Sequence, residues 1–112
     1  MPTVTVYTDE RAAKEHLKPI LSNLRKFTAQ ILSCGDRALE PEEISIRVVS
    51  TSISEMIAPI EIEIIAHHYP ERIEAADKIC LSIRAFVKEQ LSSATDVRVW
   101  LLLTELGHSW NE

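Results

Sequence analysis

The stretch IEIEII, residues 60–65, alternates apolar and acidic side chains with a period of two. This period predicts a β-strand with its isoleucines on one face, because successive side chains of a strand point to opposite sides. The stretch PTVTVY, residues 2–7, alternates in the same way and is headed by Pro2. Pro59 directly precedes the other stretch. The chain therefore contains two strands that begin alike.

After a short connection, each of these strands is followed by a segment with a helical pattern. The first helix is expected to start near Lys18 and to end at Gly35 as its C-terminal cap. Its apolar face comprises Leu17, Ile20, Leu21, Leu24, Phe27, Ile31 and Leu32. The second is expected to run from Pro70 to about Leu91, with its buried face made of Ile73, Ala76, Ile79, Cys80, Ile83, Phe86, Val87 and Leu91.

Each helix leads into a further strand, at about 44–50 and 97–104. Both strands carry an arginine between β-branched residues, at 46–48 and 97–99. We interpret this as one domain, 1–112, with an internal repeat of 2–50 and 59–104. Right-handed crossovers place both helices on one sheet face. The expected fold is α+β (α/β), a β-α-β-β-α-β chain with two helices on one face of a four-stranded mixed sheet.

The opposite sheet face is expected to be polar, but it also carries several large apolar residues. Strand parity assigns Val49, Ile65, Trp100 and Leu102 to it, beside Arg47 and Arg98. No predicted element is left to cover this face. A second copy of the chain is the natural cover, so we expect a homo-oligomer.

Composition narrows the classes of function. A net charge of −5 and a pI near 5.4 argue against a nucleic-acid partner. Two glycines exclude a glycine-rich phosphate loop, and no apolar stretch reaches the length of a membrane span. Cys34 and Cys80 lack metal-ligand spacing and are interpreted as reduced, buried thiols of a cytoplasmic protein. The histidines also lack ligand spacing, so no metal site is expected.

These features together resemble the tautomerase superfamily, which includes 4-oxalocrotonate tautomerase (4-OT) and macrophage migration inhibitory factor. The resemblance covers nearly the whole chain. It rests on the position of Pro2 after Met1, the doubled β-α-β plan, the passage from 97–99 to 104–106, and the tryptophan-containing tail at 107–111. The glycine-rich stretch that follows the last strand of short members is absent.

The resemblance implies a cofactor-independent tautomerase or isomerase that moves a proton within a small 2-oxo acid. Pro2 matches the catalytic proline, whose free amine after removal of Met1 would act as the base. Arg98 or Arg47 matches the strand arginine that binds carboxylate or enolate. The substrate-binding candidates are Arg11, Arg37, Tyr69 and Trp100, of which Arg37 stands nearest to a lysine of the cytokine-like members. Fused members of the family form trimers, so a homotrimer is implied.

The same residues also allow an interpretation in which they have a structural role only. Glu61 and Glu63 share a sheet face with Arg47 and Arg98, so either arginine could form a cross-strand ion pair. The alternatives for the whole chain are a non-catalytic trimeric relative and a ferredoxin-like small-ligand-binding domain. Strand order distinguishes them, because a hairpin of the second and third strands is ferredoxin-like, whereas two parallel pairs are tautomerase-like.

Overall fold

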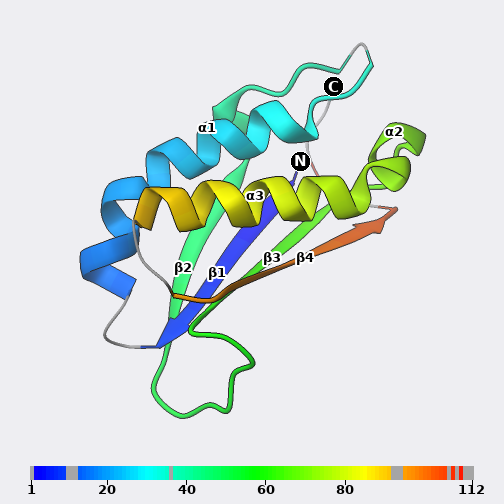
Figure 1. Cartoon of the computed structure of the whole chain (residues 1–112). Helices are drawn as coiled ribbons and strands as arrows, with labels where there is room; N and C mark the ends of the chain where they lie inside the picture. Colours follow the sequence, from blue (N-terminus) through cyan, green and yellow to red (C-terminus); the bar gives the residue numbers. More distant parts are fainter. Residues whose placement is uncertain are drawn as a thin grey trace.

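The computed structural model describes residues 2–9, 13–35, 37–91, 95–105, 107 and 109. One sheet contains the strands β1 (Thr3–Asp9), β2 (Ser45–Thr51), β3 (Ile60–His67) and β4 (Val97–Thr104). Two long helices, α1 (Leu21–Leu32) and α3 (Ala76–Leu91), cover one face of it, with the short helix α2 (Pro70–Glu74) at one end (Figure 1). The expected α+β layering is confirmed.

The strand order is β2-β1-β3-β4. The outer pairs β1–β2 and β3–β4 are parallel, and the central pair β1–β3 is antiparallel. Val6, at the middle of β1, pairs with Val48 on one side and Ile62 on the other. Because β2 and β3 are not neighbours, the ferredoxin-like alternative is excluded.

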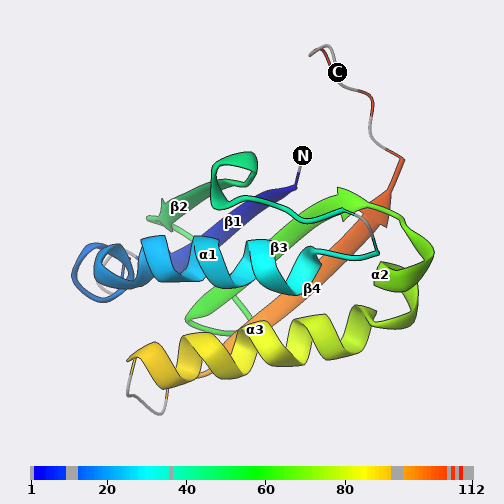
Figure 2. The ribbon, with the colours of Figure 1, turned by 90° about the horizontal axis from the view of Figure 1, so that it is seen from above.

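The core lies between the sheet and the two long helices. Most of the isoleucines and valines predicted to face the helices are almost completely buried, including Val4, Val6, Ile60, Ile62 and Ile64, whereas Ile46, Val48 and Val99 on the edge strands are half-buried. The two helices also contact each other, since the rings of Phe27 and Phe86 stack with centroids 4.4 Å apart. The helices lie side by side above the sheet (Figure 2).

The first helical segment starts near Lys18 as predicted, after a short helical piece, but it ends earlier than predicted. A π-helical turn, η1 (Ala13–Leu17), and a 3-10 turn, η2 (Lys18–Ile20), precede α1, and Pro19 fits the start of the 3-10 turn. Gly35 is not the helix cap as predicted. The backbone of Ser33 becomes extended directly after Leu32, and the Ser33 hydroxyl donates to Ala29 O at 2.8 Å. Gly35, with φ of 55°, instead forms the turn between Cys34 and Arg37.

The second helix is interrupted, although the sequence pattern predicts one continuous helix. Ala75 separates α2 from α3. The interruption changes the phase, so Ile73 is 54% exposed instead of buried, and Arg72 is buried at 3% exposure. The prediction of Ile73 as a core residue was therefore wrong.

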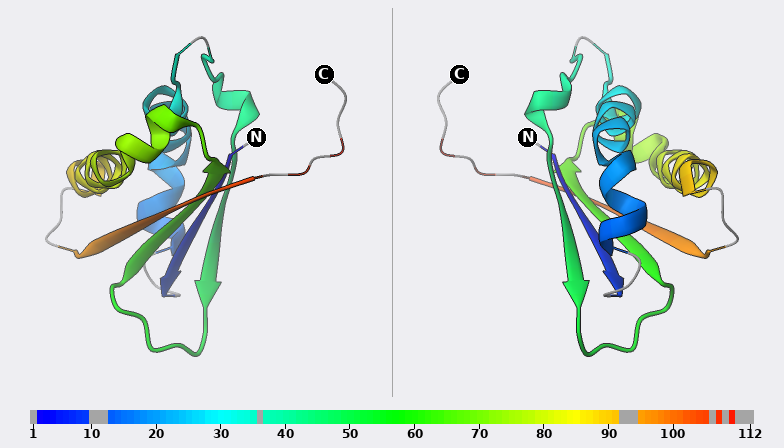
Figure 3. Two further views of the ribbon diagram at one scale, coloured as in Figure 1. Left: turned by 90° about the vertical axis from the view of Figure 1, so that its right-hand side faces the viewer. Right: turned by 90° about the vertical axis from the view of Figure 1, so that its left-hand side faces the viewer.

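No helix of the described part of the chain covers the outer face of the sheet (Figure 3). Val49, Trp100 and Leu102 are exposed there, by 37%, 45% and 56%. Cys34 and Cys80 are free thiols but half-buried, not fully buried as expected. Among the described helices, none is both long and apolar enough to cross a bilayer.

Candidate functional site

Pro2 lies at the end of the sheet where several elements meet. It is buried, and its carbonyl accepts a hydrogen bond from the Ser45 N–H of β2 at 3.2 Å. The last turn of α1, the end of β3 and helix α2 lie at this same end (Figure 1). We call this part of the molecule the Pro2 edge. It brings residues that are far apart in the sequence to one place.

Two arginines and a tyrosine form a stack at the Pro2 edge. The guanidinium carbon of Arg37 lies 4.7 Å from the centroid of the Tyr69 ring, and that of Arg72 lies 4.9 Å from it. Arg37 reaches the ring because the turn at Gly35 folds the chain back, with Arg37 N–H donating to Cys34 O at 2.8 Å. Two of the predicted substrate-binding residues, Arg37 and Tyr69, are thus in contact. We refer to Arg37, Tyr69 and Arg72 as the arginine–tyrosine stack.

Arg72 holds the stack to the rest of the fold. Its Nε donates to Leu32 O at 3.1 Å, and its Nη1 donates to His67 O at 3.0 Å. Leu32 ends α1, where unpaired carbonyls and the helix dipole favour a cation. Burial lowers the pKa of Arg72, an effect that nearby Cys34 and Tyr69 oppose and Arg37 reinforces. An arginine stays charged under such a shift, so two positive charges face Tyr69.

Sequence reasoning missed Arg72. An arginine in the first turn of a predicted surface helix gives no sign of burial, because its role depends on carbonyls from α1 and β3. The only signal was Pro70, which sets the start of the helix and thereby its phase.

Two histidines adjoin the stack. The His67 ring lies 4.7 Å from that of Tyr69 and 5.0 Å from that of His68, measured between centroids. His68 N–H donates to Thr104 O at 3.2 Å, while its buried Nδ1 has no hydrogen-bond partner among the described residues. Across the described residues, no group of three or more histidine, cysteine or acidic side chains is arranged to hold a metal ion.

The two strand arginines lie elsewhere on the sheet of the same chain. Arg47 pairs with Thr5, and Arg98 pairs with Glu61, which itself faces Tyr7. At about 3.3 Å per residue, Arg47 is displaced from Pro2 by about 10 Å along the strands and Arg98 by about 17 Å. Both point to the outer face. Arg98 donates from Nε to Asp96 at 3.0 Å, so its observed partner is not Glu61 or Glu63.

Trp100 and Arg11 complete the predicted set. Trp100 lies on the outer face beside Glu63 of β3, away from the Pro2 edge. Arg11 lies outside the described residues. The structure therefore brings Pro2, Arg37 and Tyr69 to one end of the sheet and leaves Arg47, Arg98 and Trp100 apart from them.

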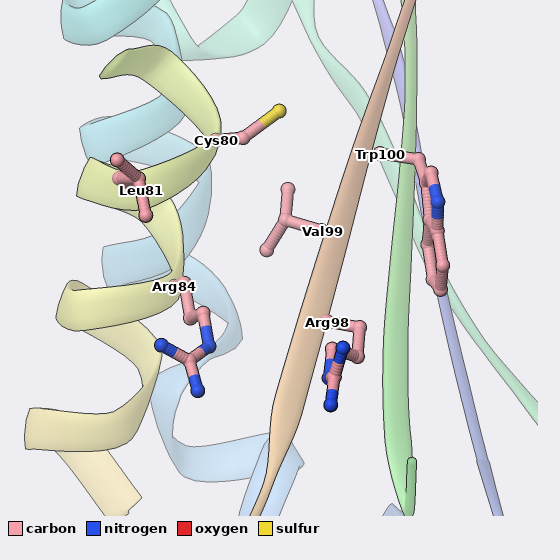
Figure 4. Close-up of a pocket in the computed structure, with 6 residues that line it drawn as sticks. All are labelled: Cys80, Leu81, Arg84, Arg98, Val99 and Trp100. Atoms are coloured by element: carbon pink, nitrogen blue, oxygen red, sulfur yellow. The ribbon is translucent and has the colours of Figure 1, made fainter. Parts of the chain in front are cut away.

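Two clefts lie along the free edges of the sheet. One of about 440 Å³ between α3 and β4 is lined by Cys80, Leu81, Arg84, Arg98, Val99 and Trp100 (Figure 4). The other, of about 530 Å³, lies between α1 and β2 and is lined by Lys18, Leu21, Ser22, Arg25, Ile44, Ser45 and Ile46. Neither is lined by Pro2, Arg37 or Tyr69. These clefts are named below by their strand, as the β4-edge cleft and the β2-edge cleft.

Comparison with known proteins supports the fold. No protein-family model matches the sequence, and no curated protein matches it. Among solved structures, a macrophage migration inhibitory factor-like protein from Entamoeba histolytica is 12% identical, with a TM-score of 0.64, covering 99% of this chain and 94% of its own. A fused 4-OT, described as an asymmetric trimer, is 18% identical, with a TM-score of 0.63 and coverages of 90% and 85%.

A protein of unknown function from Vibrio cholerae is similar as well. It is 10% identical, with a TM-score of 0.66, covering 93% of this chain and 78% of its own. At sequence identities this low, the structural similarity establishes a shared fold and nothing more specific. The resemblance to the tautomerase superfamily is thus confirmed for the architecture of the chain.

Proposed function

We propose that this protein is a tautomerase or isomerase that transfers a proton within a small 2-oxo acid, with the amine of Pro2 as the general base. The observation that carries the proposal is the position of Pro2 at the same end of the sheet as the arginine–tyrosine stack, in a fold shared with a fused 4-OT. Removal of Met1 is required, because only a free amine is basic.

The proposed chemistry depends on an amine that has cations at the same end of the sheet. An α-amino group titrates at about 7.7–8.0, and nearby positive charge lowers that pKa further. Neutral Pro2 then removes a proton from the carbon next to the 2-oxo group and returns it to oxygen or to another carbon. The carbonyl of the substrate stabilises the resulting enolate, so the reaction needs no cofactor. Arg37, which is exposed, binds the carboxylate.

The proposal gives Arg98, Arg47 and Trp100 a role only across a subunit boundary. In their own chain they lie on the outer face and away from Pro2. A second copy that covers this face would bring them towards the Pro2 edge of its neighbour. We therefore propose a homotrimer with shared sites, in keeping with the trimeric fused 4-OT. We expect it to act in the cytoplasm, on a small carboxylate-bearing substrate rather than on nucleic acid or membrane.

The test measures two properties of the mature protein, its mass and its activity on 2-hydroxymuconate and phenylenolpyruvate. Loss of Met1 and turnover of either compound are expected. One residue added before Pro2, which turns the Pro2 nitrogen into an amide, should lower kcat/KM by about 10²–10⁴-fold, the usual contribution of a general base. Pro2→Ala leaves a primary amine in place and should lose less activity, and Pro59→Ala, at the proline before the equivalent strand, is the matched control and should retain activity. Full activity in the protein with the added residue would contradict the proposed mechanism.

A second candidate is a trimeric protein of this fold without catalytic activity. The exposed apolar residues of the outer face, Val49, Trp100 and Leu102, favour self-association whether or not Pro2 is a base. Retention of Met1 in the native host, together with no turnover of either compound, would favour this candidate.

A further inference from the structure

The two clefts occupy equivalent positions in the fold. Each lies between a long helix and an edge strand, and in each an arginine of the helix binds the backbone near the start of the strand. Arg84 donates from Nε to Val97 O at 2.7 Å, and Arg25 donates from Nε to Ile44 O at 2.9 Å. The same interaction therefore occurs at both clefts, and the charged groups around it can be compared.

Two arginines that line the β4-edge cleft, Arg84 and Arg98, share a carboxylate of the chain. Asp96 Oδ1 lies 3.3 Å from Arg84 Nη2, and Asp96 Oδ2 lies 3.0 Å from Arg98 Nε. Figure 4 shows Arg84 and Arg98 extending towards the same end of the cleft from α3 and β4. Hydrogen bonds from Arg98 and then Arg84 hold the pKa of Asp96 below its usual range. The positive charge of this cleft is thus partly neutralised from within the protein.

In the β2-edge cleft the residue two positions before the strand arginine is a serine instead of an aspartate. Ser45 precedes Arg47 by two residues, as Asp96 precedes Arg98, and Arg47 Nη2 lies 3.5 Å from Ser45 Oγ. A hydroxyl carries no charge. Within the part of the chain that the structure describes, no ion pair neutralises Arg25 or Arg47.

Other residues of the β2-edge cleft add to this character. Lys18 brings a further cation, and Ser22 brings a hydroxyl. Leu21 and Ile46 supply apolar surface beside them. The acidic side chains nearest in sequence, Glu42 and Glu43, are exposed in the turn before Ile44. The cleft therefore combines hydroxyl donors, an apolar wall and cations that have no ion-pair partner among the described residues.

We propose that the β2-edge cleft binds a small molecule with a carboxylate head and an apolar body. The carboxylate accepts hydrogen bonds from the Arg25 guanidinium, as the Asp96 carboxylate does from Arg84 in the other cleft, with Lys18 and Ser45 also lining the site. The apolar body lies against Leu21 and Ile46. A volume of about 530 Å³ suits a ligand of this size. The proposal concerns binding alone and does not depend on the basicity of Pro2.

Hexanoate is the probe for this site, and hexanol is its uncharged counterpart. Each is titrated near neutral pH into isotope-labelled protein, and NMR follows the amides of Ser22 and Ser45. Hexanoate is expected to give saturable shifts at these amides, with hexanol binding at least about tenfold more weakly. Absence of saturable shifts with hexanoate, or equal binding of hexanol, would overturn the proposal.

A matched pair of variants tests the place of the carboxylate. Ser45→Asp puts a carboxylate two residues before Arg47, as Asp96 stands two residues before Arg98, and is expected to weaken hexanoate binding at least about tenfold. Ser45→Asn, of the same size but uncharged, should bind nearly as the unchanged protein does. Equal affinities of the two variants would contradict the proposal. Arg25→Gln provides a second route to loss of binding if Ser45→Asp does not fold.

The reciprocal change is made in the other cleft. Asp96→Ser removes the internal carboxylate and is expected to create a second hexanoate site, seen as new saturable shifts at the amides of Cys80 and Val99. Asp96→Glu, which keeps the charge, should create none. If Asp96→Ser gains no binding, the internal carboxylate is not what distinguishes the two clefts, and the proposal fails.

Discussion

The guanidinium Nε of Arg72 donates to the main-chain oxygen of Leu32, the last residue of α1, at 3.1 Å. The bond joins α2 to the end of α1 across 40 residues of sequence. Through Nη1 the same side chain binds His67 O at the end of β3. Three elements thus meet at one buried cation, beside the ring of Tyr69.

Replacement of Arg72 by methionine should destabilise the fold. Two buried carbonyls would lose a charged donor, at a cost of about 2–4 kcal/mol in the free energy of unfolding. Arg37→Ala is the control, because Arg37 is exposed and its contact with Tyr69 contributes less than about 1 kcal/mol. Urea denaturation followed by circular dichroism measures both. Similar losses in the two variants would show that Arg72 does not anchor this end of the sheet.

Removal of the Arg37 charge should change the pH profile of the proposed enzyme. A cation near an amine lowers its pKa, so Arg37→Ala would raise the pKa of Pro2 and move the rising limb of kcat/KM to higher pH, by roughly half a unit to one unit. KM should rise as well, since Arg37 binds the carboxylate. Arg37→Lys, which keeps the charge, should keep the position of the limb. If the rising limb of kcat/KM in Arg37→Ala stays at the same pH, the charge of Arg37 does not act on the pKa of Pro2.

A charge on the outer face should disrupt self-association. Trp100→Glu puts a carboxylate amid the exposed apolar residues Val49 and Leu102, which a covering subunit would bury. Sedimentation velocity is expected to show trimers for the unchanged protein and monomers for the variant. Ile53→Glu is the control, because Ile53 is 95% exposed in the β2–β3 connection. Association that survives in Trp100→Glu would place the interface elsewhere.

The Cys80 thiol should react slowly with alkylating reagents. Burial, and to a lesser extent the charge of Asp77, raises its pKa, so less thiolate is present at any given pH in the folded protein than in the unfolded chain. In a Cys34→Ser background, the rate of iodoacetamide labelling should reach half its maximum at a higher pH in the folded protein than in urea. Equal midpoints would contradict the effect of burial.

Local patterns predicted much of this fold correctly. The alternation of valines and isoleucines in residues 4–6 and 60–64 assigned the inner sheet face, because side-chain direction in a strand depends only on position. Strand order was left open, because the same alternation allows a β2–β3 hairpin or two parallel pairs. The helix ends were also uncertain: Ser33, not Gly35, ends α1, because the Ser33 hydroxyl bonds to Ala29 O.

The candidate site shows the same division. The sequence patterns indicated Pro2 as the head of a strand and two arginines on one sheet face, and the family resemblance added Arg37 and Tyr69 as ligand-binding candidates. Only the tertiary structure joined Arg37 to Tyr69, buried Arg72 behind them, and set Arg98 about 17 Å along the sheet from Pro2. The physical reason is that alternation acts between neighbours in the chain. Contacts across the Pro2 edge depend instead on strand register, helix phase and carbonyl groups that are distant in sequence.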